Sequence, residues 1–150
     1  MTRQITASLV PADQQIAMPS RRRRLDRLRL GVACFASDGG RSGIGQYLVN
    51  VVHRLPQLAP DDEFVVFAPE RDAHLWRALA PNARLDLVSD RYDSPVPSLL
   101  WHSAVLPRRL RAQACNAVFL PAGNRRLGLA YGVPSVATVH DLSQLHVPQK

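Results

Sequence analysis

The sequence contains no apolar run long enough to cross a membrane and few cysteines. A spanning helix needs about 18 consecutive apolar residues, and charged residues interrupt every apolar stretch of this chain before that length. The only two cysteines, Cys34 and Cys115, are too few for a disulfide framework and match no zinc-ligand spacing. These absences exclude a membrane-spanning helix and favour buried free thiols in a reducing, cytoplasmic compartment.

Aromatic side chains make up only 6% of the residues, and none is interleaved with basic residues in a pattern suited to stacking on nucleic-acid bases. The net charge of +7 is also unevenly placed, because residues 1–24 hold five arginines and a single aspartate and so carry +4 of it. We therefore expect no nucleic-acid partner. Residues 1–24 are expected to form a disordered basic tail that can touch anionic lipid at the inner face of a membrane.

The chain does contain an alternation of strand-like apolar runs and helical patterns. Strands are predicted at residues 28–35, 63–68, 84–88, 117–120 and 135–139. Helices are predicted from Ile44 until Pro56 ends or kinks the first, from a cap at Asp72 to Leu79, and from Ser98 to Ala114 with a bend at Pro107. The alternation predicts an α/β, Rossmann-like fold, with a parallel sheet covered by helices on both faces.

This pattern also assigns roles to some conspicuous side chains. Trp76 and Trp101 lie at helical positions with leucine neighbours, which indicates core packing. Arg108, Arg109 and Arg111 fit the solvated face of a helix.

Ligands of parallel sheets bind beyond the carboxyl ends of the strands, which selects the loops at residues 36–45, 121–126 and 140–143. In the first loop, Gly43 and Gly45 open a helix, where backbone N–H groups and the helix dipole can hold an anion. The loop does not match the dinucleotide fingerprint, because Leu48 stands where that motif has a glycine or alanine. It does not match the P-loop either, because Gln46-Tyr47 stand where that motif has a lysine followed by serine or threonine. A flexible connector is an equally good interpretation of these residues alone.

The other two loops add polar side chains at the same edge. His140 can donate to a hydroxyl or phosphate, with Asp141 orienting it or capping the next turn; alternatively the two are a structural pair. Asn124 and Arg125, beside a glycine turn, can contact an anionic ligand or simply be solvated. No Ser-His-Asp or Cys-His arrangement can be argued, and no metal site is expected.

Several stretches are similar to the amino-terminal domain of family 4 (group-1) retaining glycosyltransferases, which have the two-domain GT-B fold. The matching stretches cover roughly residues 27 to 148 in order. They are Gly43-Ile44-Gly45-Gln46-Tyr47, Pro60-Asp61-Asp62-Glu63-Phe64, Leu99-Leu100-Trp101 with Leu106-Pro107, Phe119-Leu120-Pro121-Ala122-Gly123-Asn124, and Pro134-Ser135-Val136-Ala137-Thr138-Val139-His140-Asp141-Leu142-Ser143.

The resemblance implies transfer of a sugar from a nucleotide-diphosphate sugar to a polysaccharide or lipid-linked acceptor, with retention and without an essential metal or other cofactor. It implies that Gly43, Gly45 and Asp141 bind the donor and that His140 acts at the reaction centre. It also implies that Asn124 and Arg125 contact acceptor or donor.

The resemblance further implies a carboxy-terminal, donor-binding domain that residues 25–150 do not contain. The chain is therefore expected to be an incomplete amino-terminal half of a GT-B enzyme, inactive alone, acting in the cytoplasm or at the inner membrane face. The alternative is a non-catalytic Rossmann-like domain that binds a phosphorylated ligand or a partner protein.

Overall fold

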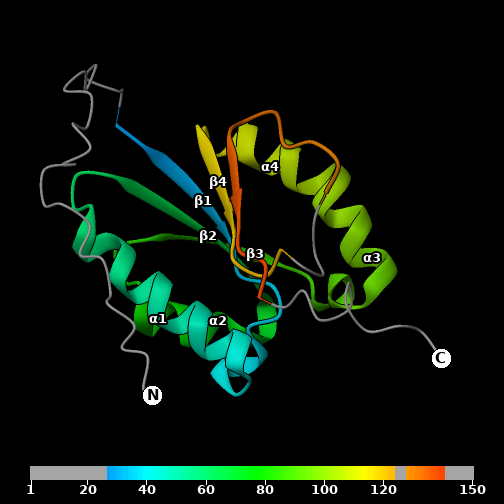
Figure 1. The fold of residues 1–150 in the computed structure, drawn as a ribbon, viewed down its shortest axis with the longest axis horizontal. Helices are drawn as coiled ribbons and strands as arrows, with labels where there is room; N and C mark the ends of the chain where they lie inside the picture. Colours follow the sequence, from blue (N-terminus) through cyan, green and yellow to red (C-terminus); the bar gives the residue numbers. More distant parts are fainter. Residues whose placement is uncertain (1–26, 124–127, 141–150) are drawn as a thin grey trace, which may run out of the picture.

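The computed structural model describes residues 27–123 and 128–140, which form one parallel sheet with helices on both faces (Figure 1). The sheet order is β3-β2-β1-β4-β5. The strands are β1 (Arg29–Ala33), β2 (Glu63–Pro69), β3 (Arg84–Val88), β4 (Ala117–Leu120) and β5 (Ser135–Ala137). The predicted Rossmann-like α/β fold is confirmed. The chain leaves β1 toward one side of the sheet and returns on the other side as β4, so the order reverses between these two strands.

The helices form two layers. Helices α1 (Gly43–Leu58) and α2 (Ala73–Leu79) cover one face, and α3 (Pro95–Leu100) and α4 (Leu106–Ala112) cover the other (Figure 1). Single 3-10 turns precede three of them, at Asp38–Gly40, Glu70–Asp72 and Asp90–Asp93.

Each layer closes its own apolar core, because side chains of a strand alternate between the two faces of the sheet. Trp76 is 1% exposed in the core beneath α1 and α2, and Trp101 is fully buried in the core beneath α3 and α4. The sheet centre is apolar on both faces, and residues 64–69 of β2 are buried without a break. The prediction that both tryptophans are core residues is confirmed.

Two prolines lie inside helical segments. Pro56 lies inside α1, which continues to Leu58; only the last turn follows it, so little hydrogen bonding is lost. The third helical region begins at Pro95 rather than Ser98 and ends at Ala112. Its irregularity is a π-helical turn, Trp101–Val105, immediately before Pro107, whose missing N–H is accommodated by this wider turn.

Arg109 is partly exposed, at 41% of its side chain, but it is not simply solvated as the sequence predicted. Its guanidinium forms an ion pair with Asp86 of β3, and Gln113 donates to the other carboxylate oxygen of Asp86 at 2.8 Å. The carboxylate side chain is only 8% exposed, so it needs these partners. The helical spacing placed Arg109 correctly on α4 but gave no information about a strand 23 residues earlier.

Both cysteines are free and buried, as expected from the sequence. Burial raises the pKa of the Cys34 thiol far above its ordinary value. It raises the pKa of Cys115 to about 11, an effect that Arg29 partly offsets and Asp86 reinforces.

We therefore expect neither thiol to react with a thiol-specific disulfide reagent at about pH 8 in the folded protein, because the reactive species is the thiolate. Both should react promptly after unfolding in guanidinium chloride, which absorbance of the released thiol would report. Rapid labelling of folded protein would contradict the burial of these two side chains.

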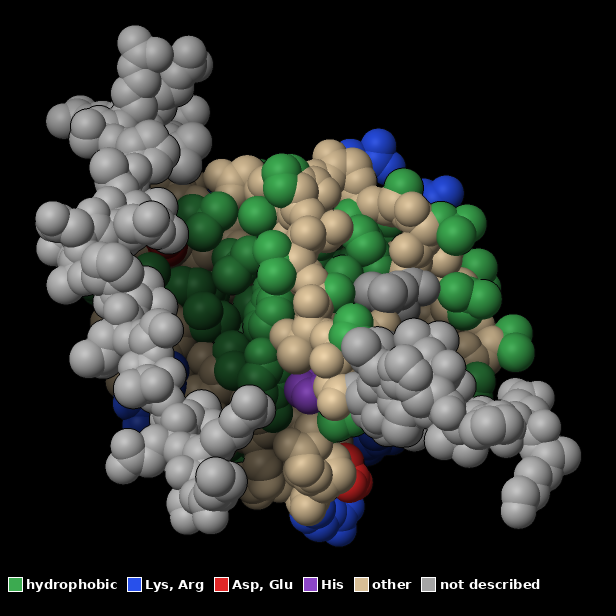
Figure 2. Space-filling view, in the orientation of Figure 1, with side chains coloured by type: hydrophobic (Ala, Val, Ile, Leu, Met, Phe, Trp, Pro, Cys, Tyr) green, Lys and Arg blue, Asp and Glu red, His purple; other side chains and the backbone are tan. Residues whose placement is uncertain are grey.

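Large apolar side chains that remain exposed gather on α3 and around β5. These are Val96, Leu99, Leu100, Leu129, Val136 and Val139, and a further one, Leu58, lies at the end of α1. Figure 2 shows hydrophobic side chains along the edge of the molecule where α3 lies. Among the described residues, no helix is both long and apolar enough to span a membrane.

Candidate functional site

The candidate site lies where the carboxyl ends of β1 and β4 diverge. At this point the strand order reverses, so the loops that leave the two strands turn to opposite faces of the sheet, which is the position where parallel sheets commonly bind ligands. The loop after β1 carries the glycines noted in the sequence, and the loop after β4 begins at Pro121. The end of β5, with His140, follows on the same edge.

The first turn of α1 presents backbone donors at this edge. Ser42 caps the helix: its Oγ accepts from the Gly45 amide at 3.1 Å, and its carbonyl accepts from Gln46 at 2.8 Å. The amides of Gly43 and Ile44 form no hydrogen bond within the described part of the chain. A helix of 16 residues directs its dipole through these two donors, so an anion there is stabilised.

The loop before this turn has an unusual backbone. Ala36 and Asp38 have φ values of 63° and 49°, and Gly39 and Gly40 follow at 59° and 77°. Left-handed conformations cost about 1–2 kcal/mol for a residue that carries a Cβ atom. The loop is held in place by local bonds: the Gly40 amide donates to the Ser37 carbonyl at 2.7 Å, and the Gln46 side chain donates to the Gly40 carbonyl.

The two predicted glycines differ in their surroundings. A Cβ atom on Gly45 would lie 2.3 Å from the Ser37 carbonyl oxygen, whereas a Cβ atom on Gly43 would meet nothing within 4 Å. Gly45 is buried and lets α1 pack directly against the loop backbone, while Gly43 is exposed at the helix start. Gly45 is therefore a packing requirement, and Gly43 is the residue that faces outward.

The loops that follow β4 and β5 are bonded to each other. The Gly123 amide donates to the Thr138 carbonyl, and the Thr138 amide donates to the Leu120 carbonyl, both at 3.0 Å. A Cβ atom on Gly123 would lie 2.8 Å from that of Ala137, so glycine permits this close approach. The predicted convergence of these two loops is thus a direct contact.

His140 is held against the first helix. Its imidazole lies edge-on to the Tyr47 ring, with 4.8 Å between ring centroids and 81° between planes. The Tyr47 hydroxyl is 3.0 Å from the Thr138 hydroxyl, and His140 Nε2 donates to the Pro121 carbonyl at 2.6 Å. Tyr47 therefore joins the start of α1 to the loops after β4 and β5, which brings all three predicted loops together.

The bond to Pro121 fixes the imidazole tautomer. A carbonyl can only accept, so Nε2 carries the hydrogen and the neutral ring has its lone pair on Nδ1. Nδ1 forms no hydrogen bond to any described residue, and the side chain is exposed. The neutral ring can accept a hydrogen bond from a ligand hydroxyl, and the protonated ring can donate one to an anion.

Three predicted site residues, Asn124, Arg125 and Asp141, lie outside the described residues, as does the predicted tail at residues 1–24. Two side-chain contacts near the site were not predicted from the sequence. One is Tyr47 with Thr138. The other is Ser37 with Asp72, whose carboxylate accepts from the Ser37 hydroxyl instead of capping α2. A polar residue directly after a buried strand was the available signal for Ser37.

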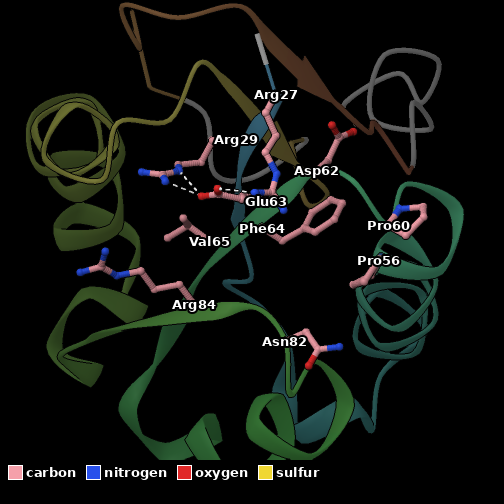
Figure 3. Close-up of a pocket in the computed structure, with 10 residues that line it drawn as sticks. All are labelled: Arg27, Arg29, Pro56, Pro60, Asp62, Glu63, Phe64, Val65, Asn82 and Arg84. Atoms are coloured by element: carbon pink, nitrogen blue, oxygen red, sulfur yellow. Dashed lines mark hydrogen bonds and ion pairs between the residues drawn. The ribbon is translucent and has the colours of Figure 1, made fainter.

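A hollow of about 450 Å³ lies at the amino ends of the strands, opposite the candidate site (Figure 3). It surrounds the first residues of β1, β2 and β3. Three of its charged side chains pair with one another, since Glu63 contacts both Arg27 and Arg29, and Arg29 also donates to the Gln113 carbonyl at 3.0 Å. The side chain of Arg84, which also lines the hollow, forms no ion pair with the described residues. These pairs tie the strand starts together, and we interpret this hollow as structural.

Among the described residues no group of three histidine, cysteine or carboxylate side chains is placed to hold a metal ion. The groups of the candidate site that can bind a ligand are therefore the amides of Gly43 and Ile44 and the imidazole of His140. The chain matches no family model, no curated protein and no solved structure, so its function has to be argued from this geometry.

Proposed function

We propose that this chain is the acceptor-side part of a retaining glycosyltransferase of the GT-B type, which transfers a sugar from a nucleotide-diphosphate sugar to a polysaccharide or glycolipid acceptor. The observation that carries the proposal is the contact of Tyr47 with both Thr138 and His140, which brings α1, whose first two amides have no partner among the described residues, beside an imidazole. A nucleotide-diphosphate sugar offers the matching pair of groups, a diphosphate next to a hydroxylated ring.

The amides of Gly43 and Ile44 suit the diphosphate. In the transfer, the bond from the anomeric carbon to the diphosphate oxygen breaks, and that carbon bonds to an acceptor hydroxyl oxygen, whose proton passes to the leaving diphosphate. Negative charge grows on the leaving group during this step. Fixed backbone donors and a helix dipole interact more strongly with that charge than with the ground state, and so lower the barrier.

His140 suits the sugar. Because His140 Nε2 already donates to the Pro121 carbonyl, Nδ1 is the ring atom that can bind a hydroxyl of the donor sugar. Such a bond would orient the anomeric carbon toward the acceptor. We propose that the nucleotide is held by a second domain, as the sequence resemblance implies, and that residues 1–150 alone bind ligand but do not turn it over.

Binding can be tested on the chain itself. Titration of the ¹⁵N-labelled chain with inorganic pyrophosphate, and with UDP-glucose and GDP-mannose, should shift the amide signals of Gly43 and Ile44. The nucleotide sugars should also shift the ring signals of His140. Sulfate at equal ionic strength is the control for unspecific anion effects. Shifts confined to Asn82 and Arg84, at the amino ends of the strands, would contradict the proposed site.

The two interpretations of the sequence predict different activities. If the full-length gene product releases nucleoside diphosphate and glycosylates an acceptor, the transferase proposal holds. If it binds phosphorylated ligands at Gly43 and His140 but transfers no sugar from any common nucleotide sugar, the protein is a non-catalytic ligand-binding domain.

A further inference from the structure

Asp72 is a buried carboxylate to which the proposed chemistry gives no role. It is 5% exposed and follows β2 at the carboxyl edge of the sheet, close to the loop after β1. It stands at the cap position of α2, yet its side chain makes no capping bond. Its Oδ2 accepts instead from the hydroxyl of Ser37, which is fully buried. A carboxylate is seldom buried without a structural or functional reason.

Ser37 lies in the loop at residues 36–45, which we call the glycine loop, and makes several of its contacts. Its carbonyl accepts from the Gly40 amide at 2.7 Å, and the same oxygen is the atom that a side chain at Gly45 would strike. Residues on both sides of Ser37 have left-handed backbones, at Ala36 and Asp38. Such a conformation persists only where surrounding contacts enforce it. Asp72 supplies a contact from another element, 35 residues away in sequence.

We infer that Asp72 is a positioning residue, which acts through Ser37 to hold the glycine loop in the conformation that presents the α1 amides to the diphosphate of the donor. The inference rests on the proposed function. Asp72 itself touches no ligand in this arrangement, because its carboxylate is turned inward to Ser37. Its contribution is to fix the loop before the ligand arrives, so that binding need not order it.

The test compares Asp72→Ala, Ser37→Ala, the double variant and Asp72→Asn by titration of the chain with inorganic pyrophosphate. Each alanine variant should raise the dissociation constant about tenfold, the size expected for one buried charge-assisted hydrogen bond. The double variant should be no weaker than either single variant, because both remove the same contact. Asp72→Asn keeps an acceptor for the hydroxyl and should stay within about threefold of wild type.

Glu70→Ala is the matched control, since it removes one negative charge two residues away from an exposed position. It should leave pyrophosphate binding unchanged or slightly tighter. Urea denaturation identifies variants that fail to fold; should Asp72→Ala fail, Ser37→Ala carries the test. The inference is overturned if the alanine variants bind as wild type does, if Asp72→Asn binds as weakly as they do, or if Glu70→Ala weakens binding equally.

Hydrogen exchange separates this inference from the proposed function. The Gly40 amide should exchange at least about tenfold faster in Asp72→Ala and Ser37→Ala than in wild type or Glu70→Ala, without any ligand present. If pyrophosphate does not bind the wild-type chain, the proposed anion site is wrong. Unchanged exchange at Gly40 would show that Asp72 does not hold the loop, whatever the ligand.

Discussion

Under the proposed transferase function, replacing His140 by alanine in the full-length gene product should lower kcat for sugar transfer about a hundredfold while changing KM for the donor much less. The side chain is exposed and its Nε2 is bound to the Pro121 carbonyl, so its removal costs the fold little. The loss should therefore appear in the transition state, where the orientation of the donor sugar matters most. Initial rates of nucleoside diphosphate release, measured over a range of donor concentrations, would separate kcat from KM.

Two controls accompany this variant. His74→Ala removes an exposed imidazole from α2 that forms no hydrogen bond with the described residues of the candidate site, and should leave kcat unchanged. Arg22→Ala, in the basic stretch outside the described residues, should also leave it unchanged. Equal kcat for His140→Ala and wild type would remove His140 from the site, and the transferase proposal would then have only the α1 amides to support it.

Gly45→Ala should lower the free energy of unfolding by about 3 kcal/mol, because the new methyl group would lie 2.3 Å from a backbone oxygen that cannot move without disturbing the loop. The matched substitution Gly43→Ala places its methyl group in open space. Alanine also favours helix, so this second variant should be within about 1 kcal/mol of wild type or slightly more stable.

Urea denaturation of both variants, followed by tryptophan fluorescence, checks this pair. Trp76 and Trp101 are buried on opposite faces of the sheet, so the signal reports both cores. Similar midpoints for Gly45→Ala and Gly43→Ala would mean that the loop can move away from α1, and the described packing would be wrong.

The architecture followed from the sequence because local patterns determined it. Apolar runs such as residues 64–68 are continuous where a strand is buried on both faces, and the spacing of Leu48 and Val52 places one side of α1 in the core. Boundaries were less predictable where proline was involved. Pro56 and Pro107 were interpreted as helix-breaking or bending, and the chain accommodates them with a late position and a π-helical turn.

The candidate site was predictable only in part, since its contacts join residues far apart in sequence. The topological rule brought the three loops to one edge, and His140 and Gly43 were chosen from it. Nothing in the local sequence links Tyr47 with Thr138, which are separated by 91 residues, or Ser37 with Asp72. Gly43 and Gly45 have the same predicted role, and only the packing around each distinguishes the outward-facing Gly43 from the buried Gly45.

Because β5 is short, the two sides of the proposed site should differ in flexibility. This edge strand has three residues, all exposed, and its only described strand partner is β4, whereas the helix start rests on a fully packed core. Edge segments with few buried contacts open at a lower free-energy cost than central strands. The segment after β5, which carries His140, should therefore move more easily than the start of α1 opposite it. A ligand that bridges the two would tighten the edge of the sheet as it binds, and part of its binding energy would be spent on that ordering.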